Sequence, residues 1–284
     1  MKPSSTPVVV LGPLAFPAGI VAVLAGVVVT FLIAAWLQRR GDRPTERMLW
    51  LLLALALFAA RAAFVLRWWP PYLAQPSSVL NLRDGGFSPW AGLLALAVAA
   101  ALIAWRRPAL RAPLAWSVGG GVLVWGFAGV VAQRLGAASD APLPDLRLRD
   151  AGGQTVVLRD LRGKPMVINL WASWCGPCRR ELPVLARAQR QLPGVRFVFA
   201  DQGESASTVR AFLRVHKLQL EYVVIDDGMQ LSQHYGARGY PTTLFLDAQG
   251  HLRDTHMGEL SAATLAESLG HVTAVESPAS GDPH

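Results

Sequence analysis

The only two cysteines of the 284-residue sequence, Cys175 and Cys178, stand three positions apart in the segment WCGPC. The segment follows the apolar run Met166–Leu170, and Pro177 suits the first turn of a helix because it has no N–H to leave unpaired. At a helix N-terminus, backbone N–H groups and the dipole stabilise a thiolate, which predicts Cys175 as the attacking sulfur. Cys178, on the same helix face, is then placed to attack the mixed disulfide. The pair therefore predicts thiol–disulfide exchange.

Two other uses of a cysteine pair fit the sequence less well. A structural zinc site needs four ligands, and the six histidines provide no second ligand pair of matching pattern: His216, His234, His251, His256, His271 and His284. A structural disulfide gains little entropy from closing so short a loop, which favours a redox-active bond. We therefore predict that the Cys175–Cys178 disulfide is itself the redox group, with no metal ion and no other cofactor.

The segments around the pair alternate between strand-like and helical patterns. The sequence predicts strands over residues 155–158, 166–170, 196–200, 222–225 and 243–246, and helices over about 175–191, after Ser207 and from Ser261. The four residues Asp247–Gly250 predict a hairpin turn before a last strand. Strands separated by helices indicate a mixed α/β layer fold.

The first 136 residues have a different composition. Four apolar stretches predict transmembrane helices at about residues 8–37, 49–66, 90–105 and 114–132. The third is the shortest, about 24 Å long against a hydrocarbon core of about 30 Å, so its flanks or the bilayer must adapt. The first is too long for a cleaved signal peptide, and no small-residue cleavage site follows it. A mean hydropathy of +0.32 also excludes a disordered chain.

The basic residues set the predicted orientation. Residues 1–136 hold 12 lysines and arginines against three acidic residues, whereas the remainder holds 15 against 16, so the net charge of +8 comes from the apolar part. Seven arginines lie in the first and third loops between the predicted spans: Arg39, Arg40, Arg43, Arg47, Arg106, Arg107 and Arg111. The positive-inside rule then places these loops in the cytoplasm of a bacterial inner-membrane protein, with the N-terminus and everything beyond the fourth span in the periplasm. The basicity thus indicates orientation and not a nucleic-acid partner.

The boundary between two domains falls where the composition changes. Residues 137–145 are rich in small residues and proline, which is typical of a linker. We therefore predict a transmembrane domain over residues 1–136, the linker over 137–145, a soluble α/β domain over 146–272 and a disordered tail over 273–284.

Two segments of the soluble domain resemble the thioredoxin superfamily, and within it the TlpA/ResA-like membrane-tethered branch. They are residues 144–183, which contain WCGPC, and GYPTTLFLDAQG at residues 239–250. The resemblance implies a thioredoxin fold, a cis peptide bond before Pro241, and a substrate strand bound along Tyr240, Pro241 and Thr242 by backbone hydrogen bonds. It also places three supporting residues around the reactive pair: Trp174, Gly176 and Pro177.

Two further positions favour this branch. Asn169 stands six residues before Cys175, where thioredoxin itself has a buried aspartate, and an amide cannot shuttle a proton. Glu181 matches a glutamate of the TlpA/ResA-like branch that could take that role; the alternative is an exposed helix glutamate paired with an arginine such as Arg180. Two tryptophans are expected to pack around the site, Trp171 and Trp174.

Four short segments of the first domain resemble the front part of prolipoprotein diacylglyceryl transferase, which moves a diacylglyceryl group from phosphatidylglycerol to a lipoprotein cysteine: residues 11–16, 60–65, 71–76 and 85–93. Arg61, the one charge inside a predicted span, falls on an arginine of that family, and we expect it to face lipid or to reach the interface. Where the family has a histidine, this sequence reads Trp90-Ala91-Gly92, and the later GRxGNFxNxE signature is missing. The resemblance implies a shortened, catalytically silent relative that serves as an anchor or lipid-facing scaffold.

These patterns together predict a membrane-anchored periplasmic thiol–disulfide oxidoreductase. The Gly-Pro dipeptide between the cysteines is that of reducing thioredoxins, so we expect a reductase of protein disulfides, with cytochrome c maturation as the process that related proteins serve. A disulfide oxidase of the same fold and a lipid-modifying or lipid-binding protein using Arg61 are the alternatives. Because no cysteine precedes Cys175, the spans cannot carry dithiol electrons, and a separate membrane dithiol reductase must be the electron donor. The predicted partners are protein disulfides, that donor and the phospholipid membrane.

Overall fold

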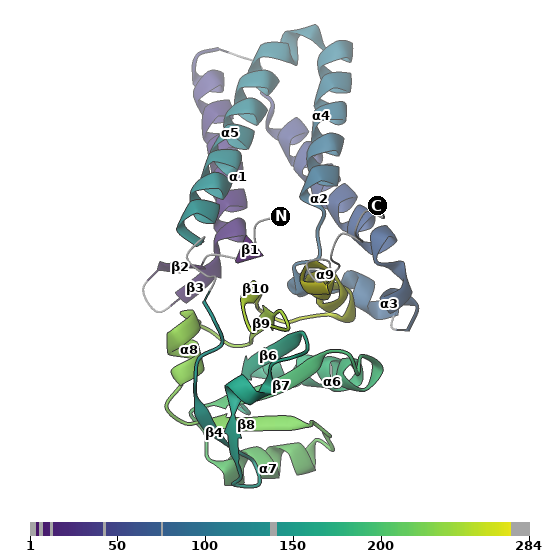
Figure 1. Cartoon of the computed structure of the whole chain (residues 1–284). Helices are drawn as coiled ribbons and strands as arrows, with labels where there is room; N and C mark the ends of the chain where they lie inside the picture. Colours follow the sequence, from purple (N-terminus) through teal and green to yellow (C-terminus); the bar gives the residue numbers. More distant parts are fainter. Residues whose placement is uncertain are drawn as a thin grey trace, which may run out of the picture. The chain divides into compact units, whose positions relative to one another are not determined.

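The computed structural model describes residues 4–5, 8–11, 14–41, 44–74, 76–136 and 141–273. The chain divides into two compact units (Figure 1). We call residues 9–80 with 85–134 the helical unit, and residues 135 onward, with 1–8 and 81–84, the α/β unit. The first part of the predicted linker, residues 137–140, and the predicted tail from residue 274 lie outside the described residues.

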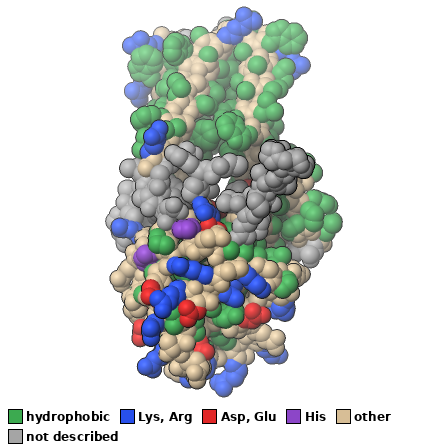
Figure 2. Space-filling model, viewed as in Figure 1, with side chains coloured by type: hydrophobic (Ala, Val, Ile, Leu, Met, Phe, Trp, Pro, Cys, Tyr) green, Lys and Arg blue, Asp and Glu red, His purple; other side chains and the backbone are tan. Residues whose placement is uncertain are grey.

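The helical unit contains four helices that are long and apolar enough to cross a membrane, as the sequence predicts. They are α1 (Ala18–Arg39), α2 (Glu46–Arg67), α4 (Pro89–Arg106) and α5 (Arg111–Gly136). Between α2 and α4 lie the short helix α3 (Trp69–Ala74) and the 3-10 turns η1 (Pro76–Leu80) and η2 (Leu82–Asp84), and η3 (Pro108–Leu110) precedes α5. Figure 2 shows apolar side chains over the surface of this unit, as lipid contact requires, and charges of both signs on the visible face of the other.

The first span begins later than predicted. The sequence pattern places it from residue 8, but the helix starts at Ala18, after two short strands that pair with each other, β2 (Val8–Leu11) and β3 (Leu14–Pro17). Pro17 accounts for the difference, because proline lacks an N–H donor and disfavours a helical conformation in the residue before it. The remaining 22 residues of α1 are still long enough to span a bilayer.

Helices α1 and α5 approach each other closely at a pair of glycines. A side chain at Gly26 would place its Cβ 2.8 Å from the carbonyl oxygen of Gly121, which no real Cβ tolerates. Small residues at such crossings allow close backbone packing between membrane helices, where the hydrophobic effect cannot drive association. Apolar side chains from α1, α2, η3 and α5 form the core of the unit beside this crossing: Ala34, Leu49, Leu52, Leu110 and Leu114.

Arg61 does not face lipid, contrary to the sequence-based expectation. Its side chain is only 7% exposed, and its guanidinium points into the connector between α3 and α4. Nη1 donates to the carbonyl of Gly86 at 2.7 Å, Nε to that of Val79 at 3.1 Å and Nη2 to that of Ser78 at 3.2 Å. A planar guanidinium with several donors can satisfy three carbonyls at once, so Arg61 fixes the fold of the connector.

Arg61→Ala is expected to destabilise the helical unit by about 3 kcal/mol or more, since it removes charge-assisted hydrogen bonds to the carbonyls of Ser78, Val79 and Gly86. Thermal unfolding of the full chain in detergent measures the effect. Arg67→Ala, which removes an exposed arginine of the same helix, is the matched control. Equal melting temperatures for the two variants would contradict this role of Arg61.

The α/β unit is built on a mixed sheet with strand order β1-β10-β9-β6-β7-β8-β4-β5. The central strands β6 (Met166–Trp171), β7 (Arg196–Gln202) and β8 (Tyr222–Asp226) run parallel, and β9 (Thr242–Leu246), β10 (Leu252–Met257), β4 (Arg147–Asp150) and β5 (Thr155–Val157) join in antiparallel pairings. At the far edge, β1 (Ser4–Ser5) pairs with β10 in parallel. This arrangement confirms the predicted mixed α/β fold of the thioredoxin type.

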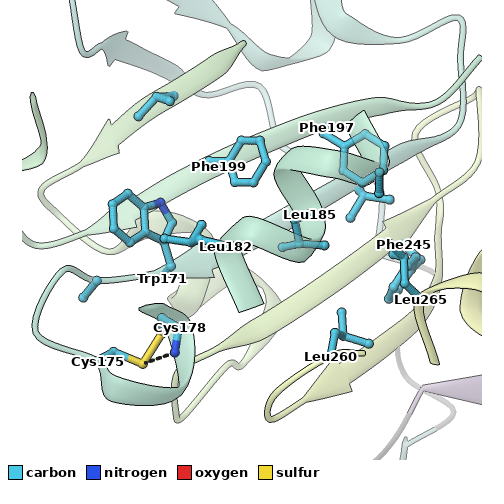
Figure 3. Close-up of a cluster of buried hydrophobic side chains, with 14 of the residues drawn as sticks. Trp171, Cys175, Cys178, Leu182, Leu185, Phe197, Phe199, Phe245, Leu260 and Leu265 are labelled. Carbon is cyan, nitrogen blue, oxygen red and sulfur yellow. Dashed lines mark hydrogen bonds between the residues drawn. A yellow bond between two sulfur atoms is a disulfide. The ribbon is translucent and has the colours of Figure 1, made fainter. Parts of the chain in front are cut away.

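Helices cover both faces of this sheet. Because side chains alternate along a strand, Val167 and Trp171 of β6 contribute to one core together with α6 (Gly176–Gln191), α7 (Ala206–Val215) and α9 (Ala262–Thr273). Met166, Ile168 and Leu170 contribute to the core on the other face, with the turn η4 (Leu158–Leu161) and α8 (Gln230–Tyr235). Figure 3 shows the first of these cores, which extends from Phe245 and Leu265 to the two cysteines.

Three local features differ from or refine the predictions. The predicted hairpin turn is present: Gly250 donates to the carbonyl of Asp247 at 3.0 Å and adopts a φ of 87°, which favours glycine. Residues 141–145 are not a free linker, since Leu143 is buried and its N–H donates to Gly250. Two short elements of this unit, β4 and α8, are absent from the predictions.

Candidate active site

Cys175 and Cys178 form a disulfide bond at the N-terminus of α6 (Figure 3). Cys175 is the N-cap residue, and its Sγ accepts a hydrogen bond from the backbone N–H of Cys178 at 3.2 Å. Such a donor stabilises negative charge on Cys175 sulfur when the bond is reduced. Cys175 is 4% exposed and Cys178 is completely buried. An approaching thiol or disulfide therefore reaches Cys175 first.

The turn before Cys175 is held by a side chain that the sequence analysis did not single out. Glu204 accepts hydrogen bonds from the backbone N–H of Ser173 at 2.5 Å and from its hydroxyl at 2.7 Å. The N–H of Cys175 donates to the carbonyl of Ala172 at 3.2 Å, which closes the turn. Because Glu204 follows β7, the parallel neighbour of β6, the rule that functional groups gather at the carboxyl ends of parallel strands could have identified it.

Asp201, the next carboxylate in this region, is fully buried at the end of β7. Its Oδ1 accepts from the backbone N–H of Glu204 at 3.0 Å, whereas its Oδ2 has no hydrogen-bond partner among the described residues. Burial, followed by the neighbouring Glu204 carboxylate, raises the pKa of Asp201 to about 8. Asp201 thus holds a proton at neutral pH.

Glu181 is buried, which rules out the alternative of an exposed helix glutamate. Its Oε1 accepts from the Asn169 amide at 2.6 Å and its Oε2 from the backbone N–H of Leu260 at 2.9 Å, while Arg180 pairs instead with Glu259 at 2.8 Å. Desolvation raises the pKa of Glu181 to about 8 despite these two hydrogen bonds, which act in the opposite direction. Glu181 and Cys178 lie three residues apart on α6, so both face the interior on the same side of the helix.

The predicted substrate-binding residues lie beside the active-site turn. The Tyr240–Pro241 peptide bond is cis, and Thr242, the first residue of β9, pairs with Leu170 of β6. The ring of Tyr240 meets that of Trp174 edge-on, with 6.2 Å between the ring centroids. Among the described residues, the backbone N–H and C=O of Tyr240 have no hydrogen-bond partner. They are available to an incoming strand.

The two tryptophans of the motif behave differently. Trp171 packs as expected: it is fully buried, and its ring lies 5.3 Å from that of Phe212. Trp174 does not pack into the site, because 68% of it is exposed. The structure places it on the surface with Tyr240 as its aromatic neighbour. Gly176 is also exposed, and Pro177 is half-buried in the first turn of α6.

In the part of the chain that the structure describes, no group of three His, Cys, Asp or Glu side chains could hold a metal ion. The chemistry available at the site is that of the disulfide itself, which accepts or delivers two electrons as its S–S bond breaks or forms.

Comparison with protein families gives two matches, one for each part of the chain. Residues 140–255 match the AhpC/TSA family, and residues 9–138 match prolipoprotein diacylglyceryl transferase. The second match includes all four apolar helices, and the first includes the disulfide, Glu181 and the cis-proline segment.

Individual relatives match the C-terminal half. The thioredoxin-like protein YneN of Bacillus subtilis is 30% identical over 141 residues, which cover 48% of this chain and 82% of the relative. The thiol-disulfide oxidoreductase ResA of the same organism is 31% identical over 49% of this chain and 74% of the relative. Among solved structures, a putative thiol:disulfide interchange protein DsbE from Chlorobium tepidum aligns at 28% identity, with a TM-score of 0.42 over 45% of this chain and 92% of that one.

Proposed function

The chain belongs to the thioredoxin-like thiol–disulfide oxidoreductases, and from this premise we propose that it is a membrane-anchored reductase of protein disulfides. The observation that carries the proposal is the different setting of the two cysteines at the N-terminus of α6. Cys175 keeps 4% of its surface exposed and its Sγ accepts an N–H hydrogen bond, whereas Cys178 has no exposed surface. One sulfur is thus suited to attack a substrate, and the other to resolve the adduct.

The reaction balances without any other redox group. In the reduced protein, the Cys175 thiolate attacks a substrate disulfide, forms a mixed disulfide and expels one substrate thiolate. Cys178, once deprotonated, attacks Cys175 Sγ, closes the Cys175–Cys178 bond and releases the second substrate thiolate. The substrate gains two electrons, and its two released thiolates take up two protons from solvent. A separate membrane dithiol reductase then returns two electrons to the disulfide.

Glu181 serves in this scheme as the base that takes the proton from Cys178. It is buried on the same face of α6, and its raised pKa of about 8 suits a group that must exchange a proton near neutral pH. Asn169 orients the carboxyl group through its 2.6 Å hydrogen bond to Oε1. Asn169 therefore positions the base, Glu181, and does not itself take the proton.

Substrate binds along the free backbone of Tyr240, next to Pro241 and Thr242. The unpaired N–H and C=O of Tyr240 support this assignment, since an extended peptide pairs with exposed backbone groups by strand addition. Trp174 offers an exposed aromatic surface beside the same edge. Oxidised apocytochrome c is the protein disulfide to try first, because the TlpA/ResA-like resemblance implies a place in cytochrome c maturation.

The α/β unit acts on the periplasmic side of the inner membrane. The arginines between α1 and α2 and between α4 and α5 support this orientation, because positive loops stay in the cytoplasm. Protein disulfides persist in that compartment, so a reductase there has substrates.

The reduction potential of the disulfide distinguishes a reductase from an oxidase. We expect the full chain in detergent, equilibrated with glutathione or dithiothreitol buffers, to give a value below about −150 mV. The fraction of the Cys175–Cys178 disulfide, measured by thiol alkylation and mass spectrometry, provides the readout. A potential well above about −150 mV would instead assign the chain to the oxidases, as for the strongly oxidising members of this fold.

A further inference from the structure

A chain of hydrogen-bonded side chains connects the buried ends of two central strands to the substrate-binding edge. It begins at Asp226, the last residue of β8, passes through Gln202, the last residue of β7, and Ser232 of α8, and ends at the phenol of Tyr240. Asp226, Gln202 and Ser232 are buried. We call these three residues the buried relay. None of them takes part in the disulfide chemistry.

The donor and acceptor of each hydrogen bond in the relay can be assigned in turn, starting from the Asp226 carboxylate. The Asp226 carboxylate accepts from the backbone N–H groups of Gln230 at 2.8 Å and Leu231 at 2.9 Å, at the start of α8. Its Oδ2 also lies 3.0 Å from the Gln202 side chain, so the NH₂ group of that amide must face it. The carbonyl Oε1 of Gln202 is then the acceptor for the Ser232 hydroxyl at 2.6 Å.

This order fixes the role of Tyr240. A serine hydroxyl has one proton, and that of Ser232 is donated to Gln202. The 3.1 Å contact between the Ser232 and Tyr240 oxygens can therefore be a hydrogen bond only if Tyr240 is the donor. The phenol proton of Tyr240 points inward, and its ring is held at a defined angle against the exposed ring of Trp174.

Holding this ring also holds the backbone that bears it. Tyr240 precedes the cis-proline, and its own N–H and C=O lack partners among the described residues, so the relay is the polar attachment of this residue to the interior. Fixing a binding edge in advance lowers the entropy lost when a partner binds. A small disulfide that does not pair with the backbone gains nothing from such an edge.

We propose that the buried relay positions Tyr240 for extended polypeptide segments, and thereby selects protein disulfides over small-molecule disulfides. The inference rests on the proposed function, since it concerns the substrate class of the same site. It identifies Ser232, Gln202 and Asp226 as positioning residues that act through Tyr240 without touching the reacting sulfurs.

Ser232→Ala in the reduced full chain tests this inference. We expect the rate constant for reduction of a disulfide-containing peptide to fall about fivefold to tenfold, as the loss of one buried hydrogen bond implies. The rate constant for oxidised glutathione should stay at the parent value. Ser268→Ala, which truncates an equally buried serine in α9, is the matched control and should leave both rates unchanged.

A second variant separates positioning from a general loss of stability. Tyr240→Phe removes the same hydrogen bond from its exposed end and should reduce the peptide rate to a similar extent. Because both substitutions delete one interaction, the double variant should be no slower than either single variant. Three results would overturn the inference. The peptide rate could be unchanged in Ser232→Ala, the glutathione rate could fall as much as the peptide rate, or the fold-losses of the two single variants could multiply in the double variant. If the parent chain reduces neither disulfide, the proposed function itself fails, and this inference with it.

Discussion

Cys175→Ser abolishes disulfide exchange in the full chain, whereas Cys178→Ser keeps the first half of the reaction. The difference follows from burial: Cys175 is the sulfur that an approaching substrate can reach, and Cys178 is completely covered. A serine oxygen at position 175 cannot form the mixed disulfide, and the remaining thiol is inaccessible. Reduction of a labelled peptide disulfide by the purified, reduced chain measures the loss.

The Cys178→Ser variant is the matched control for this experiment, since it also leaves a single thiol. We expect one equivalent of substrate thiol to be released quickly and no second equivalent to follow, because the resolving sulfur is missing. Equal residual activity in the two variants, or a stable adduct on Cys178 in the Cys175→Ser chain, would contradict the assigned roles. A lipid-transfer activity that depended on Arg61 would not be affected by either substitution.

Glu181→Gln should slow the second step about a hundredfold and leave the first unchanged, as the loss of a proton acceptor implies. The variant keeps the size of the side chain and an oxygen for the Leu260 N–H, while its NH₂ group faces Asn169, whose amide must turn its oxygen toward it. The wild-type rate of resolution should rise as pH increases toward the Glu181 pKa of about 8, and the variant should lose this rise. Stopped-flow release of the second thiol provides the measurement.

The same carboxyl group affects stability with a definite sign. Its pKa is about 8 in the folded protein against 4.5 as the ordinary value, so the folded state binds one more proton between these pH values. Stability is therefore greatest below the ordinary pKa and falls as pH rises toward 8, by about 1.4 kcal/mol per pH unit for one such group. The pKa of Asp201 is also raised to about 8, so this group adds a second loss of folding stability as pH rises.

Glu181→Gln should remove the part of the stability loss at rising pH that comes from Glu181, leaving the part from Asp201. The melting temperature of the α/β unit should then depend less on pH than in the parent chain. Calorimetric scans at several pH values compare the slopes. Glu221→Gln, at an exposed glutamate of the same unit, is the control and should keep the parent slope. Equal slopes for Glu181→Gln and the parent would show that Glu181 is ionised in the folded protein.

The local features of the site could be predicted from sequence. The cysteine spacing, the preceding apolar strand and Pro177 together place Cys175 at a helix N-terminus, and all three signals lie within a dozen residues. The spans were equally predictable, because a bilayer imposes length and apolarity on each segment separately. The largest difference is at the start of α1, because the apolar segment before Pro17 is not helical.

The tertiary features could not be predicted in this way. Glu181 accepts a hydrogen bond from the N–H of Leu260, a residue 79 positions later in the chain, and no local pattern encodes that contact. Glu204 reaches Ser173 only because β7 pairs with β6 in parallel. Arg61 likewise turns inward because the connector after α3 brings the carbonyls of Ser78 and Gly86 to it, a contact that a hydropathy profile does not contain.

A trapped mixed disulfide on Cys175 would show which disulfide the chain attacks. In membranes that carry the full chain with Cys178→Ala, we expect a covalent adduct between Cys175 and a periplasmic protein, sensitive to dithiothreitol and absent in Cys175→Ser. Non-reducing electrophoresis followed by mass spectrometry identifies the partner and the linked cysteine. An adduct with glutathione alone, or no adduct, would contradict the conclusion that the chain reduces protein disulfides.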